Sequence, residues 1–308
     1  MEPIKSRVLV VGCTGYIGRL MAQASLDLNH PTYLLVRPDV VHDIRRVEIV
    51  LGFKAQGAKL LEGSLDDNES LLAALKQVDV VVSAMAENRL LSQLKLVEAI
   101  KQAGNIKRFL PSEFGMDPDR MHHALKPGNH VFESKREVRR AVEAAGIPHT
   151  FVSANCFAGY FLSSLAQFAQ FMPPKEKVFI YGDGTAKVVW VVEADVGRYA
   201  LSTVDDPRAV NKTIYIRPPA NVLSQKEVVE MWEEMSGVTL VKCHIPEEDF
   251  LRDLQGPPSP KNEALSIFYH VFYKGECSNF DISDDVSASH LYPHIDYMSA
   301  SSYLKRFL

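Results

Sequence analysis

Three glycines stand at three-residue spacing behind the apolar run Val8–Val11, at Gly12, Gly15 and Gly18. An unbroken apolar run is typical of a buried parallel strand. Glycines at its end let the chain turn tightly, approach a phosphate and pack the next helix closely. Because helix N-termini favour anions, and a helix is expected from near Tyr16, the stretch predicts a dinucleotide pyrophosphate site. Its expected members are Gly12, Thr14, Gly15, Tyr16, Ile17 and Gly18. The spacing G-x-x-G-x-x-G departs from the usual G-x-G-x-x-G, so a plain strand-to-helix turn is the alternative.

Two arginines indicate which dinucleotide this site would take. Arg37 follows a second expected strand, Thr32–Val36, and stands nineteen residues after Gly18. NAD-specific proteins carry an acidic residue near this position for the ribose 2′-hydroxyl. A guanidinium can instead fork onto a 2′-phosphate. The sequence therefore favours NADP(H), with Arg46 as a second cation; the alternative for both arginines is a solvated surface position.

Lys135 is the candidate for proton transfer. It stands four residues before Arg139, so both side chains share one face of a helix expected at Val131–Ala145. Burial and a cation one turn away would both lower the lysine pKa and make Lys135 a usable base towards a phenol. Common short-chain reductases carry a tyrosine four residues before this lysine, whereas position 131 is valine. The alternative is a solvated cation paired with a neighbouring glutamate.

The charge and composition exclude several kinds of partner. The 308 residues are 46% hydrophobic and carry a formal net charge of −4, which is typical of a globular protein with one large or two modest domains. A mildly acidic protein is not attracted to nucleic acid or to an anionic membrane surface. No apolar run approaches the ~18 residues of a membrane span. We therefore expect no nucleic acid and no membrane among the partners.

The cysteines and histidines predict neither a disulfide framework nor a metal site. The cysteines contain no C-x-x-C pair and are scattered, at Cys13, Cys156, Cys243 and Cys277. The adjacent His122 and His123 have no third ligand at metal spacing. The first expected strand follows the N-terminus almost at once, which leaves no room for a signal peptide. A reducing cytosol is therefore the expected compartment.

Strand and helix patterns alternate along the first half of the chain. Apolar runs predict strands at Val8–Val11, Thr32–Val36, Lys59–Gly63, Val78–Ala84, Lys107–Leu110 and His149–Ser153. Helical patterns separate them at Val40–Gln56, Ser70–Leu75, Gln93–Gln102 and Val131–Ala145. This alternation predicts an α/β fold, a Rossmann-type doubly wound parallel sheet. Ligands lie at the carboxyl ends of such strands, so two segments are expected to face the cofactor or the substrate: Ser83, Ala84 and Met85, and Pro111, Ser112, Glu113 and Phe114.

The second half changes to an α+β pattern. Met116–His130, rich in Pro, Asp, His and Gly, is interpreted as an active-site loop or lid. An apolar helical stretch is expected at Asn155–Phe171. Further strands and helices are expected at Val178–Tyr181, Val188–Val192, Thr213–Ile216, Gln225–Ser236 and Glu247–Leu254. We predict an NADP(H)-binding domain at 1–155 and a smaller, mainly substrate-binding α+β domain at 156–308, with some segments returning to the first.

Several longer stretches carry a resemblance to a known family. They are Gly12–Gly18, Val36–Pro38, Lys107–Pro118, Val152–Phe161, Asn211–Pro219, Asn221–Val229 and Leu291–Pro293. With them the chain resembles the plant isoflavone-reductase-like, NmrA-type branch of the atypical short-chain dehydrogenases and reductases, and within it most closely the pinoresinol-lariciresinol reductases. The resemblance covers nearly the whole chain.

The resemblance implies an NADPH-dependent oxidoreductase that opens benzylic ether rings of lignans through a quinone methide. It implies that Lys135 is the base on a substrate phenol, that Arg139 takes part in cofactor binding, and that Arg37 and Arg46 recognise the 2′-phosphate. It also places further cofactor contacts at Asn155, Cys156 and Phe157. Substrate contacts are expected at Met116, Phe161 and His270. For His270 the alternative is a histidine of the core or the surface without a role in binding. A homodimer is expected from the family.

One departure leaves the substrate class open. Nine residues, Met85–Gln93, separate Ala84 from Leu94, where the lignan reductases usually carry a longer loop. This length is nearer to the phenylcoumaran benzylic ether and isoflavone reductases, which are therefore alternatives. A third alternative is a non-catalytic regulator that senses NADP(H), because related folds bind the cofactor without reducing a substrate. Enantiomer preference and the number of rings reduced lie beyond the sequence.

Overall fold

The computed structural model describes residues 4–308, which divide into two compact units. Unit 1 comprises residues up to 113 together with 134–152 and 196–214. Unit 2 comprises 114–133, 153–195 and 215–308. The segment 114–133 therefore belongs to unit 2, although the sequence-based boundary placed it in the first domain, and 196–214 returns to unit 1.

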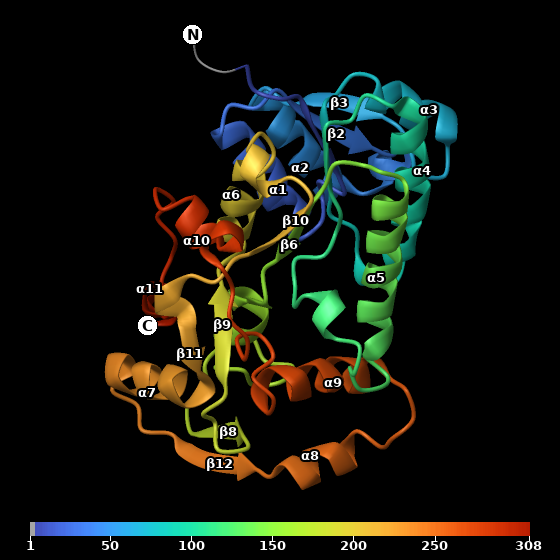
Figure 1. Cartoon of the computed structure of the whole chain (residues 1–308). Helices are drawn as coiled ribbons and strands as arrows, with labels where there is room; N and C mark the ends of the chain where they lie inside the picture. Colours follow the sequence, from blue (N-terminus) through green and yellow to red (C-terminus); the bar gives the residue numbers. More distant parts are fainter. Residues whose placement is uncertain (1–3) are drawn as a thin grey trace. The chain divides into compact units, whose positions relative to one another are not determined.

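Unit 1 contains a five-stranded sheet in the order β3-β2-β1-β4-β5 (Figure 1). Its strands are β1 (Val8–Val11), β2 (Thr32–Val36), β3 (Lys59–Glu62), β4 (Val80–Ser83) and β5 (Arg108–Leu110). All neighbouring strands run parallel, with Val8 opposite both Thr32 and Val80. The strand order reverses between β1 and β4, which is the switch point where doubly wound sheets bind ligands. The predicted Rossmann-type α/β fold is confirmed.

The helices of unit 1 follow the strands in alternation. They are α1 (Gly18–Asp27), α2 (Ile44–Ala55), α3 (Asn68–Leu75), α4 (Gln93–Ala103), the later part of α5 (Asn129–Ala144) and most of α6 (Glu193–Ser202). Alternate strand residues such as Leu9 and Val81 join a buried cluster with α3, α4 and α5, through Leu75, Leu96 and Val138. Helix α1 packs against β1 and β2. A parallel bridge from Phe109 to His149 leads to β6 (Thr150–Ser153), which pairs with β10 (Lys212–Tyr215).

Unit 2 contains two small sheets and an aromatic core. Strand β9 (Lys187–Val191) lies between β7 (Cys156–Phe157) and β11 (Val222–Ser224), and β8 (Lys177–Tyr181) pairs with β12 (Val241–Ile245). The longer helices are α7 (Gln225–Ser236), α8 (Glu247–Asp253) and α9 (Pro260–Phe272), and the shorter ones are α10 (Ala288–Leu291) and α11 (Ala300–Leu304). The Tyr181 ring stacks on Phe272 of α9 at a centroid distance of 5.1 Å. Buried aromatic pairs of this kind add specific geometry to apolar burial.

Three stretches differ from the predicted elements. The helix expected at Asn155–Phe171 is wrong: β7 is followed by a π-helical turn at Ala158–Leu162, and Leu165 and Ala166 have φ angles of 55° and 63°. Side-chain hydrogen bonds hold this path, because the Gln225 Nε2 donates to the Leu165 carbonyl at 3.1 Å. The helix expected at Val40–Gln56 is two pieces, a 3-10 turn at Pro38–His42 and α2. The loop after Met85 contains a 3-10 turn, η2, at Glu87–Ser92.

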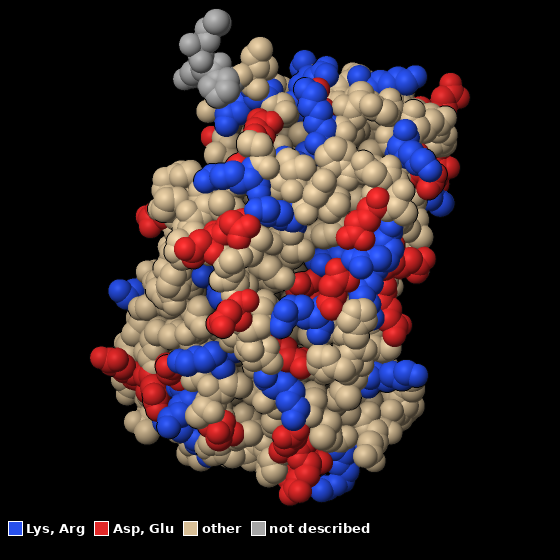
Figure 2. All heavy atoms as spheres, in the orientation of Figure 1, with Lys and Arg blue, Asp and Glu red and all other residues tan. Residues whose placement is uncertain are grey.

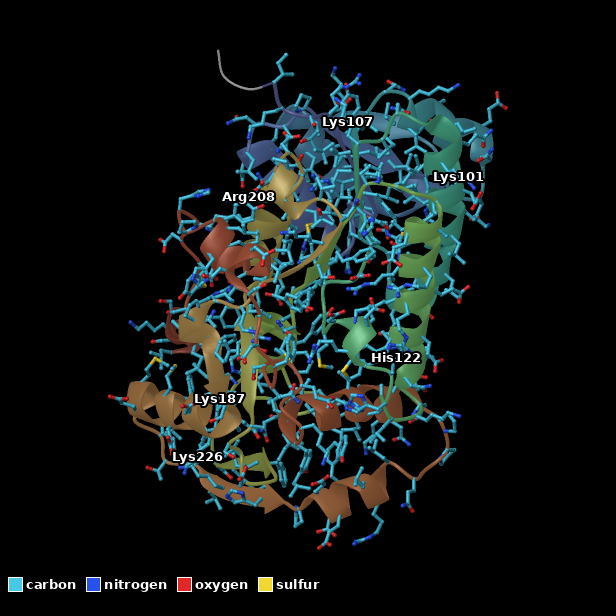
Figure 3. All side chains as sticks on the ribbon, in the orientation of Figure 1. Lys101, Lys107, His122, Lys187, Arg208 and Lys226 are labelled. Carbon is cyan, nitrogen blue, oxygen red and sulfur yellow. The ribbon has the colours of Figure 1, made fainter. Side chains whose placement is uncertain are left out.

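The surface carries both charge signs. On the face drawn in Figure 2, basic and acidic side chains are interspersed, in agreement with the net charge of −4. Lysines such as Lys101 on α4 and Lys107 before β5 are exposed (Figure 3). Between residues 4 and 308, none of the helices combines the length and the apolarity that crossing a membrane requires.

Candidate active site

The turn between β1 and α1 can be built only with glycine at two of its positions. Gly12 has a φ of +85°, and a Cβ there would lie 2.4 Å from the Ala84 carbonyl oxygen. A Cβ at Gly18 would lie 2.0 Å from the Gly12 carbonyl oxygen. These glycines therefore bring the turn close to the end of β4 and bring α1 close to the turn. Among the described residues no side chain caps α1 at Ile17, so its first turn can offer N–H groups to an anion.

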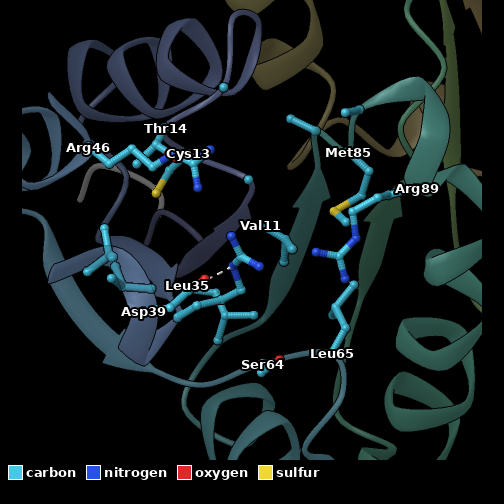
Figure 4. A pocket seen from close by; sticks show the side chains of 17 residues that line it. Val11, Cys13, Thr14, Leu35, Asp39, Arg46, Ser64, Leu65, Met85 and Arg89 are labelled. Carbon is cyan, nitrogen blue, oxygen red and sulfur yellow. Dashed lines mark ion pairs between the residues drawn. The ribbon is translucent and has the colours of Figure 1, made fainter. Parts of the chain in front are cut away.

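The turn opens onto a pocket of about 230 Å³ at the carboxyl edge of the sheet (Figure 4). Its walls come from the ends of β1, β2 and β4, the residues after β3, and the start of η2. The lining residues are Val11, Gly12, Cys13, Thr14, Gly15, Leu35, Val36, Arg37, Asp39, Val40, Arg46, Ser64, Leu65, Ala84, Met85, Ala86 and Arg89. Burial raises the pKa of the Cys13 thiol to about 11, so this side chain is a neutral part of the wall. The glycine turn and the cationic lining fit a phosphorylated dinucleotide.

Both arginines predicted for the 2′-phosphate line this pocket. The Arg37 Nε lies 3.4 Å from the Asp39 carboxylate, and the Arg46 Nε lies 3.1 Å from the Asp43 carboxylate. Asp43 also caps α2, because its Oδ1 accepts from the Arg45 and Arg46 backbone N–H groups. The cap therefore fixes where α2 begins and places Arg46 in the first turn beside the pocket.

Lys135 lies in unit 1 among charged neighbours. It is half-buried as a residue, and removal of its amine from water lowers the lysine pKa. The carboxylates of Glu113 and Glu87 oppose this decrease, and the Arg139 guanidinium adds to it. A lysine with a lowered pKa holds more of the neutral amine near pH 7, which is the form that accepts a proton. The sequence-based expectation about the direction of this pKa is therefore confirmed.

Arg139 is held by a buried ion pair with Glu113. Its Nε and Nη2 donate to the two Glu113 carboxylate oxygens at 2.7 and 2.6 Å, and the two side chains are 1% and 3% exposed. The guanidinium also stacks over the Phe151 ring at 4.4 Å from its centroid. The structure places Arg139 outside the pocket lining, so its part in cofactor binding stays a prediction. Glu113 was expected from the sequence to face the cofactor or the substrate; the structure instead places it outside the pocket lining and pairs it with Arg139.

The residue before Glu113 is hydrogen-bonded to the pocket wall. The Ser112 hydroxyl donates to the carbonyl of Met85, a lining residue, at 3.0 Å. The Ser112 backbone N–H donates to the Gln93 Oε1 at 2.7 Å. Glu113 follows directly and pairs with Arg139, four residues from Lys135. The segment after β5 therefore contacts the pocket wall through Ser112 and holds Arg139 through Glu113, all within unit 1.

The predicted unit 2 residues lie around β7 and α9. Asn155 has a φ of 54° and its backbone N–H donates to the Gly115 carbonyl at 3.1 Å. Cys156 is buried with its Sγ 3.7 Å from the Cys277 Sγ, and its neighbour Phe157 stacks on Tyr160. The Phe161 ring packs against Phe268 at 5.2 Å and Phe272 at 6.2 Å. Met116 is buried. Their proposed cofactor and substrate contacts stay predictions.

Hydrogen bonds anchor the predicted lid segment within unit 2. The Leu125 backbone N–H donates to the His270 Nε2 at 2.9 Å, and the Gly128 N–H donates to the Ser266 Oγ at 3.0 Å. The Tyr215 hydroxyl donates to the Asp117 Oδ2 at 2.6 Å. His270 is 2% exposed, so this histidine supports the segment from the core of unit 2. Its contact with a substrate stays a prediction.

A group of potential metal ligands in unit 2 is better explained as a hydrogen-bond network. His123, His270 and Glu276 place ligand atoms within 4.8 Å of one another. The His270 Nε2 accepts from Leu125, so its Nδ1 carries the proton and donates to the Glu276 Oε2 at 2.6 Å. A metal at Nδ1 would require the opposite tautomer, with an N–H facing the Leu125 N–H. The position of the proton on the His270 ring therefore disfavours a metal at this group of residues.

The structure brings together part of the predicted cofactor set. Seven of its members line the pocket, namely Gly12, Thr14, Gly15, Arg37, Arg46, Ala84 and Met85. Gly18 acts through close packing, and Ser83 is fully buried at the end of β4. Tyr16 and Ile17 lie outside the lining, with Tyr16 39% exposed. Sequence reasoning missed Ser64, Leu65, Ala86 and Arg89, whose only available signal is their place directly after β3 and β4.

The sheet order, the glycine turn and the arginine-lined pocket are those of a dinucleotide-binding Rossmann protein. The chain belongs to the NmrA-like family, whose family model matches residues 4–304. It is 57% identical to the bifunctional pinoresinol-lariciresinol reductase of Thuja plicata over 98% of this chain and 99% of that protein.

Comparison with solved structures gives similarity to the same family. The structure described as AtPrR2 with NADP+ and (+)-pinoresinol is 48% identical, covers 99% of both chains and superimposes with a TM-score of 0.96. A structure from a group of pinoresinol-lariciresinol and phenylcoumaran benzylic ether reductases is 55% identical, covers 99% of both chains and has the same TM-score of 0.96. Each similarity spans nearly the whole chain.

Proposed function

We propose that this chain is an NADPH-dependent reductase that opens the benzylic ether rings of furofuran and furan lignans. It converts pinoresinol to lariciresinol, and lariciresinol to secoisolariciresinol. The observation that carries the proposal is the placement of Lys135. This lysine of lowered pKa lies in the unit that holds the arginine-lined dinucleotide pocket, one helical turn from Arg139. Its relative AtPrR2 binds NADP+ and (+)-pinoresinol, and 48% identity over the whole chain supports the same chemistry here.

The residues of the pocket hold the cofactor by charge and backbone contact. The Gly12–Gly15 turn and the first turn of α1 receive the pyrophosphate, and Arg37 and Arg46 receive the 2′-phosphate. When bound, NADPH supplies the hydride that reduces the benzylic carbon of the lignan. Unit 1 thus binds the cofactor, and Met116, Phe161 and His270 of unit 2 are the proposed substrate contacts.

Lys135 performs the proton chemistry. Its neutral amine accepts the proton of the phenol, and the electrons of the phenolate expel the benzylic ether oxygen. That oxygen takes up a proton and becomes the alcohol of the opened ring, and the aromatic part becomes a quinone methide. Reduction of the benzylic carbon restores the phenolate, which regains its proton. Burial assists because a desolvated lysine gives up its positive charge more readily.

Incubation with NADPH and each pinoresinol enantiomer tests the proposal. We expect loss of cofactor absorbance and formation of lariciresinol and then secoisolariciresinol, separated by chiral chromatography. A protein that binds NADPH but consumes none with either enantiomer would not be this reductase. Binding of NADPH without its consumption is the result expected of the alternative function, a regulator that senses NADP(H).

The short stretch after β4 favours a second candidate, a phenylcoumaran benzylic ether or isoflavone reductase. Its nine residues, Met85–Gln93, are mostly taken up by η2. Dehydrodiconiferyl alcohol, an isoflavone and pinoresinol offered in equal amounts separate the candidates. We expect the greatest kcat/KM for pinoresinol; a greater value for either competitor would replace the lignan proposal.

We also propose that the chain forms a homodimer. Unit 2 exposes the apolar side chains of Phe171, Phe179 and Val241, with exposures of 77%, 40% and 65%, as is common at protein contacts. Light scattering after size exclusion is expected to give twice the chain mass of 34.4 kDa. A mass of one chain over the whole concentration range would contradict the dimer.

The proposed compartment is the cytosol. All four cysteines are free, and the Cys156 and Cys277 sulfurs lie 3.7 Å apart without a bond, which suits a reducing environment. A fluorescent fusion expressed in plant cells is expected to distribute through the cytosol. Accumulation in the secretory pathway would contradict this.

A further inference from the structure

Arg89 lies on the pocket wall at a position that no sequence pattern indicated. The stretch after β4 turns at Ala86 and folds into η2, which places Arg89 among the lining residues. Figure 4 shows its side chain extending from η2 towards the side of the pocket where Leu65 lies. The Arg89 side chain is 35% exposed, so it is accessible to a ligand that enters the pocket.

A weak ion pair holds Arg89 in this position. Its Nη2 lies 3.5 Å from the Asp66 Oδ2, and the Asp66 side chain is 60% exposed. Lys95 binds the same carboxylate more closely, at 2.6 Å. Exposed ion pairs of this kind contribute little to stability. Arg89 can therefore exchange Asp66 for a ligand while Lys95 continues to neutralise the carboxylate.

Arg89 and Arg37 both lie near Asp66, which follows the lining residue Leu65 in the chain. The Asp66 carboxyl has a lowered pKa, mainly because of Lys95, and both Arg89 and Arg37 contribute to the decrease. Three arginines thus line a pocket whose only lining carboxylate is Asp39, within the part of the chain that the structure describes. Each arginine has an exposed aspartate partner, Asp39, Asp43 or Asp66, and Lys95 adds a further cation beside Asp66. The net positive charge that remains suits a phosphate monoester, which carries roughly −1.5 to −2 charges at pH 7.

We propose that Arg89 is a third cation for the adenosine 2′-phosphate and helps the pocket to select NADP(H) over NAD(H). This inference rests on the proposed function, because it assigns one more residue to the same cofactor. The stretch in which the chain departs from the lignan reductases would then have a use: it carries a phosphate-binding side chain into the pocket. Guanidinium groups suit this task because they offer several donors in one plane.

Calorimetric titration with two cofactor fragments tests the proposal without any lignan. The probes are 2′,5′-ADP, which carries the 2′-phosphate, and 5′-AMP, which lacks it. We expect Arg89→Ala to weaken 2′,5′-ADP binding about tenfold and 5′-AMP binding less than about twofold. Arg89→Lys, which keeps the charge, is expected to lose less than Arg89→Ala.

Control variants define what would overturn the inference. Lys101→Ala removes an exposed cation from α4 outside the pocket (Figure 3) and is expected to leave both affinities unchanged. Arg37→Ala is expected to reduce the preference for 2′,5′-ADP and shows that the assay detects such a loss. If Arg89→Ala weakens the binding of both fragments equally, or weakens the binding of neither, the proposed role of Arg89 is overturned. If the wild-type chain itself fails to prefer 2′,5′-ADP, the NADP(H) assignment fails instead.

Discussion

Burial and three charged neighbours set the pKa of Lys135, the proposed base. Loss of hydration lowers its pKa, Glu113 and Glu87 raise it, and Arg139 lowers it again. Because Glu113 is paired with Arg139 through two short hydrogen bonds, the two opposing influences are held at fixed positions. In the proposed mechanism the buried ion pair therefore tunes the pKa of the lysine and takes no part in proton transfer.

Removal of the amine tests the role of Lys135. We expect Lys135→Ala to lower kcat with pinoresinol by at least about 100-fold, the usual range for loss of a general base. NADPH affinity should stay within about tenfold, because the lysine lies outside the pocket lining. Lys101→Ala provides the matched control. Turnover at the wild-type rate would remove Lys135 from the mechanism.

The pH dependence of kcat/KM tests the tuning of Lys135. Activity requires the neutral amine, so it should rise with pH through a midpoint below the ordinary lysine pKa of 10.5. Glu113→Gln removes a charge that raises the pKa, so its midpoint should move to lower pH. Arg139→Gln removes a charge that lowers the pKa, so its midpoint should move to higher pH. Shifts of the same sign in both variants would contradict the assignment.

Some site residues could be predicted from the sequence and others could not. Arg37 was predictable because it follows a buried strand at the spacing of the nucleotide fingerprint. Arg89 lies in a short stretch without periodicity, and only the folding of η2 directs it into the pocket. The importance of Glu113 depends on a partner 26 positions away, a separation that no local pattern reveals.

At the scale of elements, contiguous apolar runs made the parallel strands predictable. Their side chains are buried on both faces, so β1, β2 and β4 lie where the sequence indicated them. The stretch after Asn155 is also rich in apolar residues but folds as a short strand, a π-helical turn and irregular backbone. There, side chains of Gln167 and Gln225 hydrogen-bond the backbone near Leu165 and Phe179, and this long-range support replaces helix hydrogen bonds.

The glycine turn gives a matched stability test. Gly18→Ala places a Cβ 2.0 Å from the Gly12 carbonyl oxygen. Because this distance is far too short, α1 must move away from the turn. We expect a loss of about 3 kcal/mol in the free energy of unfolding, measured with urea. Gly52→Ala in α2 has no atom within 4 Å and should stabilise by roughly 0.5–1 kcal/mol. Similar effects of the two substitutions would contradict close packing at Gly18.

The starts of β1 and β4 are joined by an ion pair that predicts a pH effect. Arg7 donates from Nε and Nη2 to the Asp79 carboxylate at 2.9 and 3.0 Å, and these hydrogen bonds lower the Asp79 pKa to about 2. A carboxyl with a lowered folded-state pKa stabilises above its unfolded value of 3.8, and this contribution disappears as the pH falls towards 2.

Asp79→Asn measures that contribution. The variant should be less stable than wild type by about 1 kcal/mol at pH 7, because the pair is only partly buried. The difference in unfolding free energy should diminish between pH 4 and pH 2, a range set by the same two pKa values. Glu98→Gln, at an exposed position of α4, serves as the control. A difference that grows as the pH falls would have the wrong sign for this ion pair.

At the scale of the whole molecule, the chain passes between its two units several times. The chain leaves unit 1 for unit 2 at residues 114–133, and it returns from unit 2 to unit 1 at residues 196–214. The sequence led us to expect that some later segments return to the first domain, but it could not show which ones, because a sequence pattern reports neighbours along the chain and not neighbours in space. The two units nevertheless keep separate tasks in the proposed function: unit 1 holds the pocket and Lys135, and unit 2 anchors Met116, Phe161 and His270.

The transfer of hydride to a lignan is the central claim, and isotope labelling measures it directly. The protein is incubated with pinoresinol and NADPH that carries deuterium at both C4 positions of the nicotinamide, and the product is analysed by mass spectrometry and NMR. We predict lariciresinol with one deuterium at the benzylic carbon released from the ether oxygen. Recovery of pinoresinol unchanged, or a ring-opened product without deuterium, would contradict the account.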